Sequence, residues 1–160
     1  MLLVLARHAE AAAAQPGQPD PERPLTAAGH ADAAATGRGL ARLLADGVLP
    51  PPPHGLFHSN YRRARETAEA WAGPTGLATE TVTLLHPGSG ISDIDLVADL
   101  YGRPPVLWMV AHQPAVGEIV RQLTKALVAV PPGAIAVMAT DTVLPGRGQL
   151  AAFFPPGSLA

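Results

Sequence analysis

The sequence predicts an α/β fold, a single three-layer α/β/α domain in which helices cover both faces of a mostly parallel sheet. Short apolar runs alternate with amphipathic segments of helical period along most of the chain. The last two apolar runs, 134–139 and 150–154, follow each other without a helix between them, which predicts an antiparallel edge strand. The 160 residues suit one domain, so we expect residues 1–154 to form it and residues 155–160 to be a loose tail.

The first third of the chain predicts a buried strand, a long loop and a helix. Residues 2–6 are wholly apolar, as in strands that are buried on both faces. Residues 11–24 contain four prolines and one glycine, which cannot sustain a helix and predict a loop. Thr26 is a suitable N-cap for a helix that runs to about Asp46, where Gly47 provides a stop.

The middle of the chain predicts two further strand–helix units. A short strand within 54–59 leads into a helix at 61–71, which the Gly-Pro pair at 73–74 is expected to end. The alternating, β-branched residues 79–84 predict a strand, and residues 92–100 predict a helix.

The last third begins with another buried strand, at 106–111. The helix predicted at 114–127 has the clearest helical period of the chain. Its apolar stripe is formed by Val116, Ile119, Val120, Leu123 and Leu127. We expect this stripe to face the core.

The composition excludes several classes of function. The chain has a formal net charge of −2, so it lacks the basic surplus that binds nucleic acid. It contains no cysteine, which excludes disulfides, thiolate catalysis and thiolate metal sites. No apolar run approaches the roughly 18 residues of a membrane span, and no basic region precedes the first apolar run as in a signal peptide. We therefore expect a cytoplasmic protein that binds neither nucleic acid nor a membrane.

Cationic and imidazole side chains follow three of the predicted strands. The first strand ends in Arg7 and His8, and the run 106–111 ends in His112. The second strand leads through Ser59 into an arginine-rich helix start with Arg62, Arg63 and Arg65. Because ligands of open α/β sheets bind beyond the carboxyl ends of the strands, we expect these groups to meet in one crevice. Guanidinium and imidazole groups there would bind a phosphate-like anion.

Each of these groups, considered alone, is also consistent with a structural or surface position that has no part in ligand binding or catalysis. His112 alone is typical of a surface histidine or of a buried one with its hydrogen bonds satisfied. The three arginines alone are equally typical of a solvated helix face that is paired with Glu66 and Glu69. His54 and His58 are four residues apart but lack nearby acidic residues, so we predict no metal site there.

Four segments of the sequence together resemble the histidine phosphatase superfamily, which has the phosphoglycerate-mutase-like fold. They are LARHAEA, RPLTAAG, HSNYRRARETAE and VAHQPAVGE, in this order. The resemblance extends from Leu2 to about Phe154. Within the superfamily, the short length and the RHAEA…RPLT layout are similar to the SixA-type phosphohistidine phosphatases. The RHA triplet alone is weakly specific, but the segments are specific in combination.

The resemblance implies a phosphate pocket made of four residues, with no metal and no cofactor. They are Arg7, His8, Arg63 and His112. His8 would be the nucleophile and would carry the phosphoryl group transiently. The other three would bind the phosphoryl oxygens, whose charge must be balanced during transfer.

The block HSNYRRARETAE matches the family motif at most positions. Ser59 and Thr67 align with its serine and threonine. Arg62 and Arg65 fall outside the motif, and we expect them to be solvent-exposed. Asn60 replaces the motif proline, which we expect to affect only the local turn.

The sequence assigns no general acid. Larger members of the superfamily place a glutamate after the third strand, whereas this chain has LLHPGSG there. Asp93, Glu10 and Glu118 are weak candidates. Because an alkoxide leaves poorly without a proton and imidazole leaves easily, the missing acid favours a phosphohistidine substrate over a sugar phosphate.

The sequence therefore favours a phosphatase that acts through a phosphohistidine intermediate. Its expected partner is a protein that carries phosphohistidine, such as a histidine phosphotransfer domain, because the chain lacks an insertion that would roof the site. A small-molecule phosphomonoesterase on the same fold is an alternative, with the loops 11–24 and 86–92 selecting its substrate. The remaining alternatives are a catalytically silent module that binds phosphate or phosphohistidine, and a mutase.

Overall fold

The computed structural model describes the whole chain, residues 1–160. Six strands form one sheet: β1 (Leu2–Arg7), β2 (Leu56–His58), β3 (Thr79–Thr81), β4 (Val106–Ala111), β5 (Ile135–Thr140) and β6 (Gly148–Phe154). The helices are α1 (Ala27–Ala45), α2 (Arg62–Thr75), α3 (Ile91–Leu100) and α4 (Ala115–Thr124), with short 3₁₀ helices η1 (Asp20–Glu22) and η2 (Thr83–Leu85). No helix combines the length and the apolar character that crossing a lipid bilayer requires.

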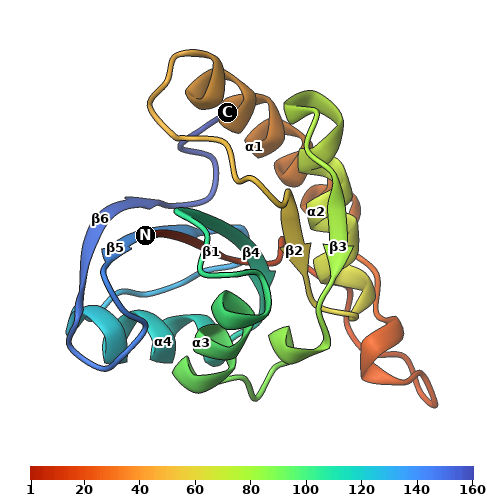
Figure 1. Ribbon diagram of the computed structural model, residues 1–160. Coiled ribbons are helices and arrows are strands. Elements are labelled where there is room, and N and C mark those ends of the chain that lie inside the picture. The colour runs from red at the N-terminus through yellow and green to blue at the C-terminus, as the bar shows by residue number, and fades with distance from the viewer.

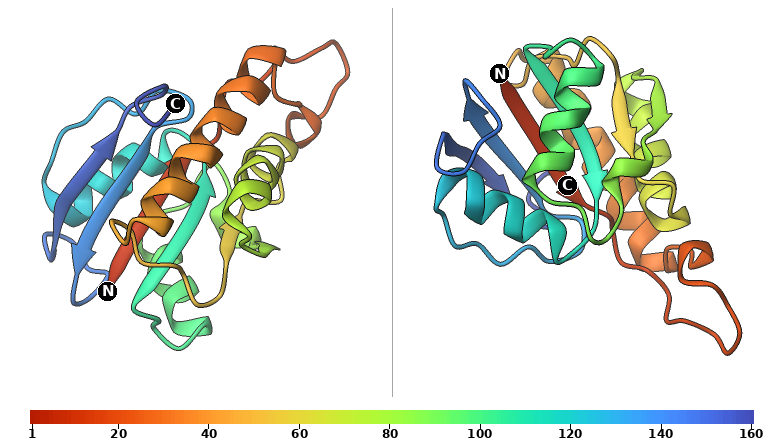
Figure 2. Two further views of the ribbon diagram at one scale, coloured as in Figure 1. Left: turned by 90° about the horizontal axis from the view of Figure 1, so that it is seen from above. Right: turned by 60° about the horizontal axis from the view of Figure 1, so that its bottom comes forward.

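The strand order in the sheet is β3-β2-β4-β1-β5-β6. The first four of these strands are parallel, whereas β5 is antiparallel to both of its neighbours and β6 forms the edge. Helices α1 and α2 cover one face of the sheet, and α3 and α4 cover the other (Figure 1 and Figure 2). The predicted α/β class, the three layers and the antiparallel edge are confirmed.

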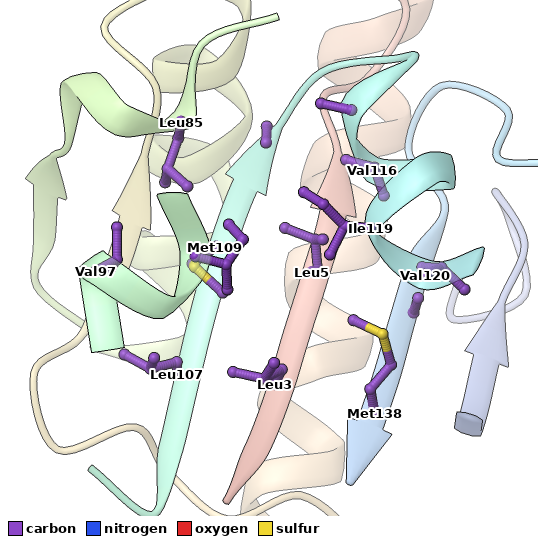
Figure 3. Close-up of a cluster of buried hydrophobic side chains, with 14 of the residues drawn as sticks. Leu3, Leu5, Leu85, Val97, Leu107, Met109, Val116, Ile119, Val120 and Met138 are labelled. Carbon is purple, nitrogen blue, oxygen red and sulfur yellow. The ribbon is translucent and has the colours of Figure 1, made fainter. Parts of the chain in front are cut away.

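Alternate residues of β1 belong to two separate hydrophobic cores. Leu3 and Leu5 pack with Ile119 of α4 on one face (Figure 3). Val4 packs in the cluster around Trp71 of α2 on the other face. A strand that is buried on both faces cannot slip against its neighbours without exchanging its two sets of side chains, so the register of β1 is fixed.

Helix α1 begins where the sequence predicts it. The hydroxyl of Thr26 accepts a hydrogen bond of 2.9 Å from Gly29 N and caps the helix. Gly37 allows α1 to lie close against α2, since a Cβ atom at this position would be 2.7 Å from Ala70 O. The loss of helix propensity at this glycine is therefore offset by the close contact between the two helices.

Helix α2 extends further than predicted. The sequence predicted that Gly73 and Pro74 end it, but it continues through Thr75 and is followed by Gly76 in a left-handed conformation with φ 70°. Proline has a φ that suits a helix and removes only one hydrogen bond, so it is tolerated in the last turn. Gly76 is the actual stop.

Two other elements are shorter than predicted. Helix α4 ends at Thr124 because Lys125 is left-handed, with φ 65°. Leu127 therefore lies outside the helix and is 85% exposed, whereas the predicted stripe placed it toward the core. Strand β3 ends at Thr81 and residues 83–85 form η2, because this edge strand is held by β2 alone and all three of its residues are exposed.

Residues 155–160 follow β6 and return to α1. Leu159 O accepts a hydrogen bond of 2.8 Å from Arg42 Nη2. The backbone of Leu159 also lies against Gly39, where a Cβ atom would be 2.1 Å from Leu159 O. The domain boundary at residue 154 and the loose tail stay predictions.

Candidate active site

The pairing of β1 with β4 brings the two predicted histidines together. The strands are in parallel register up to Arg7 and Ala111, so the residues that follow, His8 and His112, emerge at the same edge of the sheet. Their ring centroids are 5.1 Å apart and the rings are inclined by 59°. Arg63, the second residue of α2, donates a hydrogen bond to His8. Three of the four predicted pocket residues are therefore in direct contact.

The ring of His8 is held in one tautomer. Its Nδ1 lies 2.7 Å from the carbonyl of Ala9, which can only accept, so Nδ1 carries the proton and Nε2 is the free acceptor. Nε2 accepts a hydrogen bond of 3.1 Å from Arg63 Nε. Burial is the main cause that lowers the pKa of His8 to about 4, and the charges of Arg63 and Arg7 act in the same direction. At neutral pH, His8 is therefore an uncharged imidazole with an unprotonated Nε2.

Arg63 is buried, and every nitrogen of its guanidinium donates to another part of the chain. Nε faces His8, while Nη1 donates to Asp20 O at 2.9 Å and Nη2 to Asp20 Oδ2 at 3.0 Å. The guanidinium carbon lies 4.8 Å from the centre of the Tyr61 ring, as in a cation–π contact. These contacts give the guanidinium one orientation, with one edge toward His8 and the other toward Asp20.

Thr67 connects the segment after β1 to α2. Its buried hydroxyl accepts a hydrogen bond of 3.0 Å from Ala9 N and donates one of 2.7 Å to Arg63 O. The motif threonine therefore has a positioning role in this structure. The motif serine, Ser59, is also buried, and its Oγ accepts a hydrogen bond of 3.4 Å from Tyr61 N just before α2.

His112 is 1% exposed, and neither of its ring nitrogens has a hydrogen-bond partner in the protein. Burial, followed by the charges of His8 and Arg63, lowers the pKa of His112 to about 3. The Tyr61 ring contacts it edge-on at a centroid distance of 4.8 Å. Because leaving a buried polar group without a partner costs free energy, this imidazole is suited to bind an anion that enters the site.

Arg7 is the last residue of β1 and is half-buried. Its Nη1 donates a hydrogen bond of 3.0 Å to Val130 O, in the loop that follows α4. Burial and then the charge of Arg63 lower the pKa of Arg7. Two guanidiniums that repel each other in this way would be stabilised by an anion held between them.

Sequence reasoning missed three residues of the site. Asp20, in the loop 11–24, contacts Arg63 and also accepts a hydrogen bond of 2.7 Å from Arg23 Nε. No local pattern indicates Asp20, because 43 residues separate it from Arg63 and its loop has no periodicity. Arg23 lies in the RPLTAAG segment that carries the family resemblance, which was the available signal. Tyr61 stood in the motif block without an assigned role.

The carboxylates considered as general acids make other contacts. Asp93 Oδ2 accepts a hydrogen bond of 2.8 Å from the backbone at the start of α3. Glu118 pairs with Arg121 on α4, at 2.9 Å. Glu10 Oε1 accepts a hydrogen bond of 2.9 Å from Thr26 Oγ1 at the start of α1. No hydrogen bond or ion pair joins any of the three to the two histidines.

The remaining arginines at the start of α2 lie outside the cluster. Arg62 and Arg65 are exposed and pair along the helix with Glu66 and Glu69, at 2.6 and 3.7 Å. Only Arg63 of the three turns inward. The chain contains no group of three or more side chains that could hold a metal ion.

Comparison with known proteins identifies the family. Residues 3–86, more than half of the chain, match the family model of the histidine phosphatase superfamily, branch 1. The chain therefore belongs to the histidine phosphatase superfamily and is a hydrolase of the phosphatase class. A search of the curated proteins found no match.

Several solved structures share the fold. The protein histidine phosphatase SixA in complex with tungstate has a TM-score of 0.80 at 23% identity, with 100% of both chains covered. A protein from Agrobacterium tumefaciens described as the phosphohistidine phosphatase SixA has a TM-score of 0.78 at 23% identity, over 97% of both chains. A mycobacterial glucosyl-3-phosphoglycerate phosphatase has a TM-score of 0.66 at 18% identity, over 94% of this chain and 97% of its own. The fold expected from the sequence motifs is confirmed.

Proposed function

We propose that the chain is a phosphatase that forms a phosphohistidine at His8 and removes phosphoryl groups from phosphohistidine on another protein. The observation that supports this most is the state of His8. Its unprotonated Nε2 faces Arg63 and lies beside His112 in a buried, cationic cluster. A nucleophilic nitrogen next to groups that bind phosphoryl oxygens is what phosphoryl transfer to histidine requires.

In the first step, His8 Nε2 attacks the phosphorus atom, and the bond from phosphorus to the substrate's ring nitrogen breaks. The electron pair of that bond leaves with the substrate ring, which departs as neutral imidazole when its other nitrogen carries a proton. His8 keeps its proton on Nδ1 and becomes a positively charged phosphoimidazolium. The hydrogen bond from Nδ1 to Ala9 O stabilises this charge. In the free protein the same hydrogen bond acts to raise the pKa of His8, although burial outweighs it.

In the second step, a water molecule attacks the phosphorus atom and the bond to His8 Nε2 breaks. The electron pair of that bond returns to Nε2, and the water gives up one proton to solvent. Inorganic phosphate leaves, and His8 is again neutral with its proton on Nδ1.

The phosphoryl oxygens would be bound by Arg7, Arg63 and His112. The two guanidiniums donate in a planar fork that suits phosphoryl oxygens. An arriving phosphoryl dianion would raise the pKa of His112, because nearby negative charge stabilises the imidazolium form. His112 would then be a charged donor only while the substrate is bound.

Two points favour phosphohistidine as the substrate. None of the acidic residues considered as proton donors contacts the two histidines, and imidazole leaves with less help from a proton than an alkoxide does. The fold is also similar to that of proteins named SixA. The similarity to the glucosyl-3-phosphoglycerate phosphatase supports the small-molecule alternative. The presence of all four pocket residues speaks against a silent binding module.

The test compares two substrates on the wild-type protein. One is a histidine phosphotransfer domain phosphorylated on histidine, and the other is phosphoglycerate, an alkyl phosphate. We expect kcat/KM for the phosphoprotein to exceed that for the alkyl ester by at least about 100-fold, because only the alkyl ester needs a proton on its leaving oxygen. Faster turnover of an alkyl phosphate such as phosphoglycerate would replace this proposal with the small-molecule alternative.

A further inference from the structure

The segment between β1 and α1 places an acidic side chain on the phosphate-binding arginine. The segment projects beyond the body of the domain, and Figure 2 shows it beyond the end of α1. Its η1 turn begins at Asp20, whose carbonyl and carboxylate accept the hydrogen bonds of Arg63 Nη1 and Nη2. A guanidinium uses this fork to bind two phosphoryl oxygens. Asp20 therefore occupies the edge of Arg63 that a phosphoryl group needs.

The two bonds from Arg63 are the hydrogen bonds that hold this segment to the body. The other hydrogen bonds of residues 12–23 remain within the segment or with Pro24, as in the bond of 2.9 Å from Ala12 N to Pro24 O. Arg23 Nη1 donates to Ala12 O, also at 2.9 Å. Release of Asp20 would therefore leave the segment internally connected but without a hydrogen bond to the body of the domain.

The charges around Asp20 make it an exchangeable anion. Its carboxylate is shared by Arg63 and Arg23, at 3.0 and 2.7 Å, and its side chain is 51% exposed. Burial tends to raise the pKa of Asp20, but the hydrogen bonds from the two arginines lower it below the ordinary value, so the group is charged at neutral pH. A half-exposed carboxylate can move into water at lower cost than a buried one.

We propose that Asp20 is an internal competitor that substrate must displace from Arg63, and that it thereby makes the pocket selective for doubly charged phosphoryl groups. This inference rests on the proposed function, since it takes Arg63 to bind the phosphoryl group. A dianion gains about twice the Coulomb attraction that a single carboxylate gains at the same distance. A singly charged anion gains no such advantage over Asp20 and stays excluded.

The experiment measures binding of inorganic phosphate by calorimetry at pH 8, where phosphate is a dianion. It uses the wild type, Asp20→Asn and the control Glu22→Gln. Glu22 lies in the same η1 turn and makes no ion pair, so its substitution changes the net charge equally. We expect Asp20→Asn to bind phosphate about tenfold more tightly, because apparent affinity rises with the fraction of protein in which Arg63 is free. Glu22→Gln should stay within about twofold of the wild type.

Selectivity and motion provide the second readout. Formate, a singly charged anion, should compete with phosphate in Asp20→Asn and not in the wild type. Saturation of the wild type with phosphate should also accelerate amide hydrogen exchange within residues 12–23. If Asp20→Asn unfolds at a lower temperature than the wild type, Asp20→Ala replaces it with the same expectation.

A change in phosphate affinity in the opposite direction would overturn the inference. If Asp20 instead orients Arg63 for phosphate, its substitution would weaken phosphate binding. Binding by both Asp20 variants that is equal to or weaker than that of the wild type therefore contradicts competition. Phosphate binding to the wild type in that case leaves the proposed function standing. Failure of all three proteins to bind phosphate would overturn the phosphate pocket itself, and this inference with it.

Discussion

His8 and His58 are two buried histidines at the carboxyl ends of parallel strands, and only one of them lies in the candidate site. In both, Nδ1 lies close to the carbonyl of the next residue, at 2.7 Å for His8 and 2.8 Å for His58. Both strands, β1 and β2, pair with β4 in parallel. The local backbone therefore gives Nδ1 of both rings the same hydrogen-bond partner, the carbonyl of the next residue.

The two rings differ in what surrounds Nε2. Arg63 Nε donates to His8 at 3.1 Å, and the His112 ring lies 5.1 Å away, whereas His58 has neither neighbour. The strand end orients the ring in both cases, but only His8 has Arg63 of α2 and His112, directly after β4, beside it to bind a phosphoryl group. Local geometry alone therefore does not make a histidine a nucleophile.

Replacing each of the two histidines tests this comparison most severely. We expect His8→Asn to lower kcat/KM at least about 1,000-fold, because no other group can carry the phosphoryl intermediate. His58→Asn should stay within about threefold of the wild type once its folded fraction is known from thermal unfolding. The measurement is steady-state hydrolysis, together with trapping of an acid-labile phosphoenzyme that His8→Asn should not form. Equal losses in the two variants would contradict the assignment of His8.

The pH dependence of stability sharpens the comparison. The pKa of His8 is about 4 in the folded protein, below the ordinary value of 6.5, so the unfolded chain binds a proton more readily between these pH values. The contribution of neutral His8 is therefore complete above pH 6.5 and is lost as the pH falls to about 4, on the order of 3 kcal/mol. His112, with a pKa of about 3, adds to the same trend.

The measurement is the free energy of unfolding in urea at pH 7 and pH 4, for the wild type and His8→Asn. The loss on acidification should be clearly smaller in His8→Asn, because that variant lacks the group that titrates. A variant that loses as much stability as the wild type would show that His8 is not held neutral by its surroundings.

The smallest expected effect concerns Thr67, whose hydroxyl connects the segment after β1 to α2. Thr67→Val removes the acceptor of Ala9 N and the donor to Arg63 O, and we expect it to cost about 1–2 kcal/mol of stability. Activity should fall several-fold, because both His8 and Arg63 lose a support. Thr75→Val is the matched control: Thr75 also donates to the carbonyl four residues earlier in α2, at 2.6 Å, but makes no contact near His8. Denaturant unfolding and kcat/KM should separate the two variants.

The fold class could be predicted because its signals are local. Apolar runs mark the strands, and a clear helical period marks α4. The errors arise where one residue's backbone conformation ends an element, as Lys125 does for α4 and Gly76 for α2. Hydrophobic pattern does not report such conformations, so Leu127 was placed on a helix that stops before it.

The convergence of the pocket residues could be predicted for a related reason. Arg7, His8 and His112 lie at or directly after strand ends, so strand pairing determines their positions. Arg63 was singled out by the motif, because the three arginines at the start of α2 look alike in the sequence although Arg62 and Arg65 are exposed. Asp20 could not be predicted, because a proline-rich loop carries no information about where its tip lies.

The parallel pairing of β1 with β4 also divides the chain into parts that we expect to tolerate substitution to different degrees. The separation of the two imidazoles depends on strands that are enclosed on both sides, so most substitutions there would be lost with the fold. The entrance depends on surface segments such as 11–24, which tolerate insertion and exchange. Descendants of this sequence could therefore acquire new targets by altering these segments while they inherit the reaction unchanged.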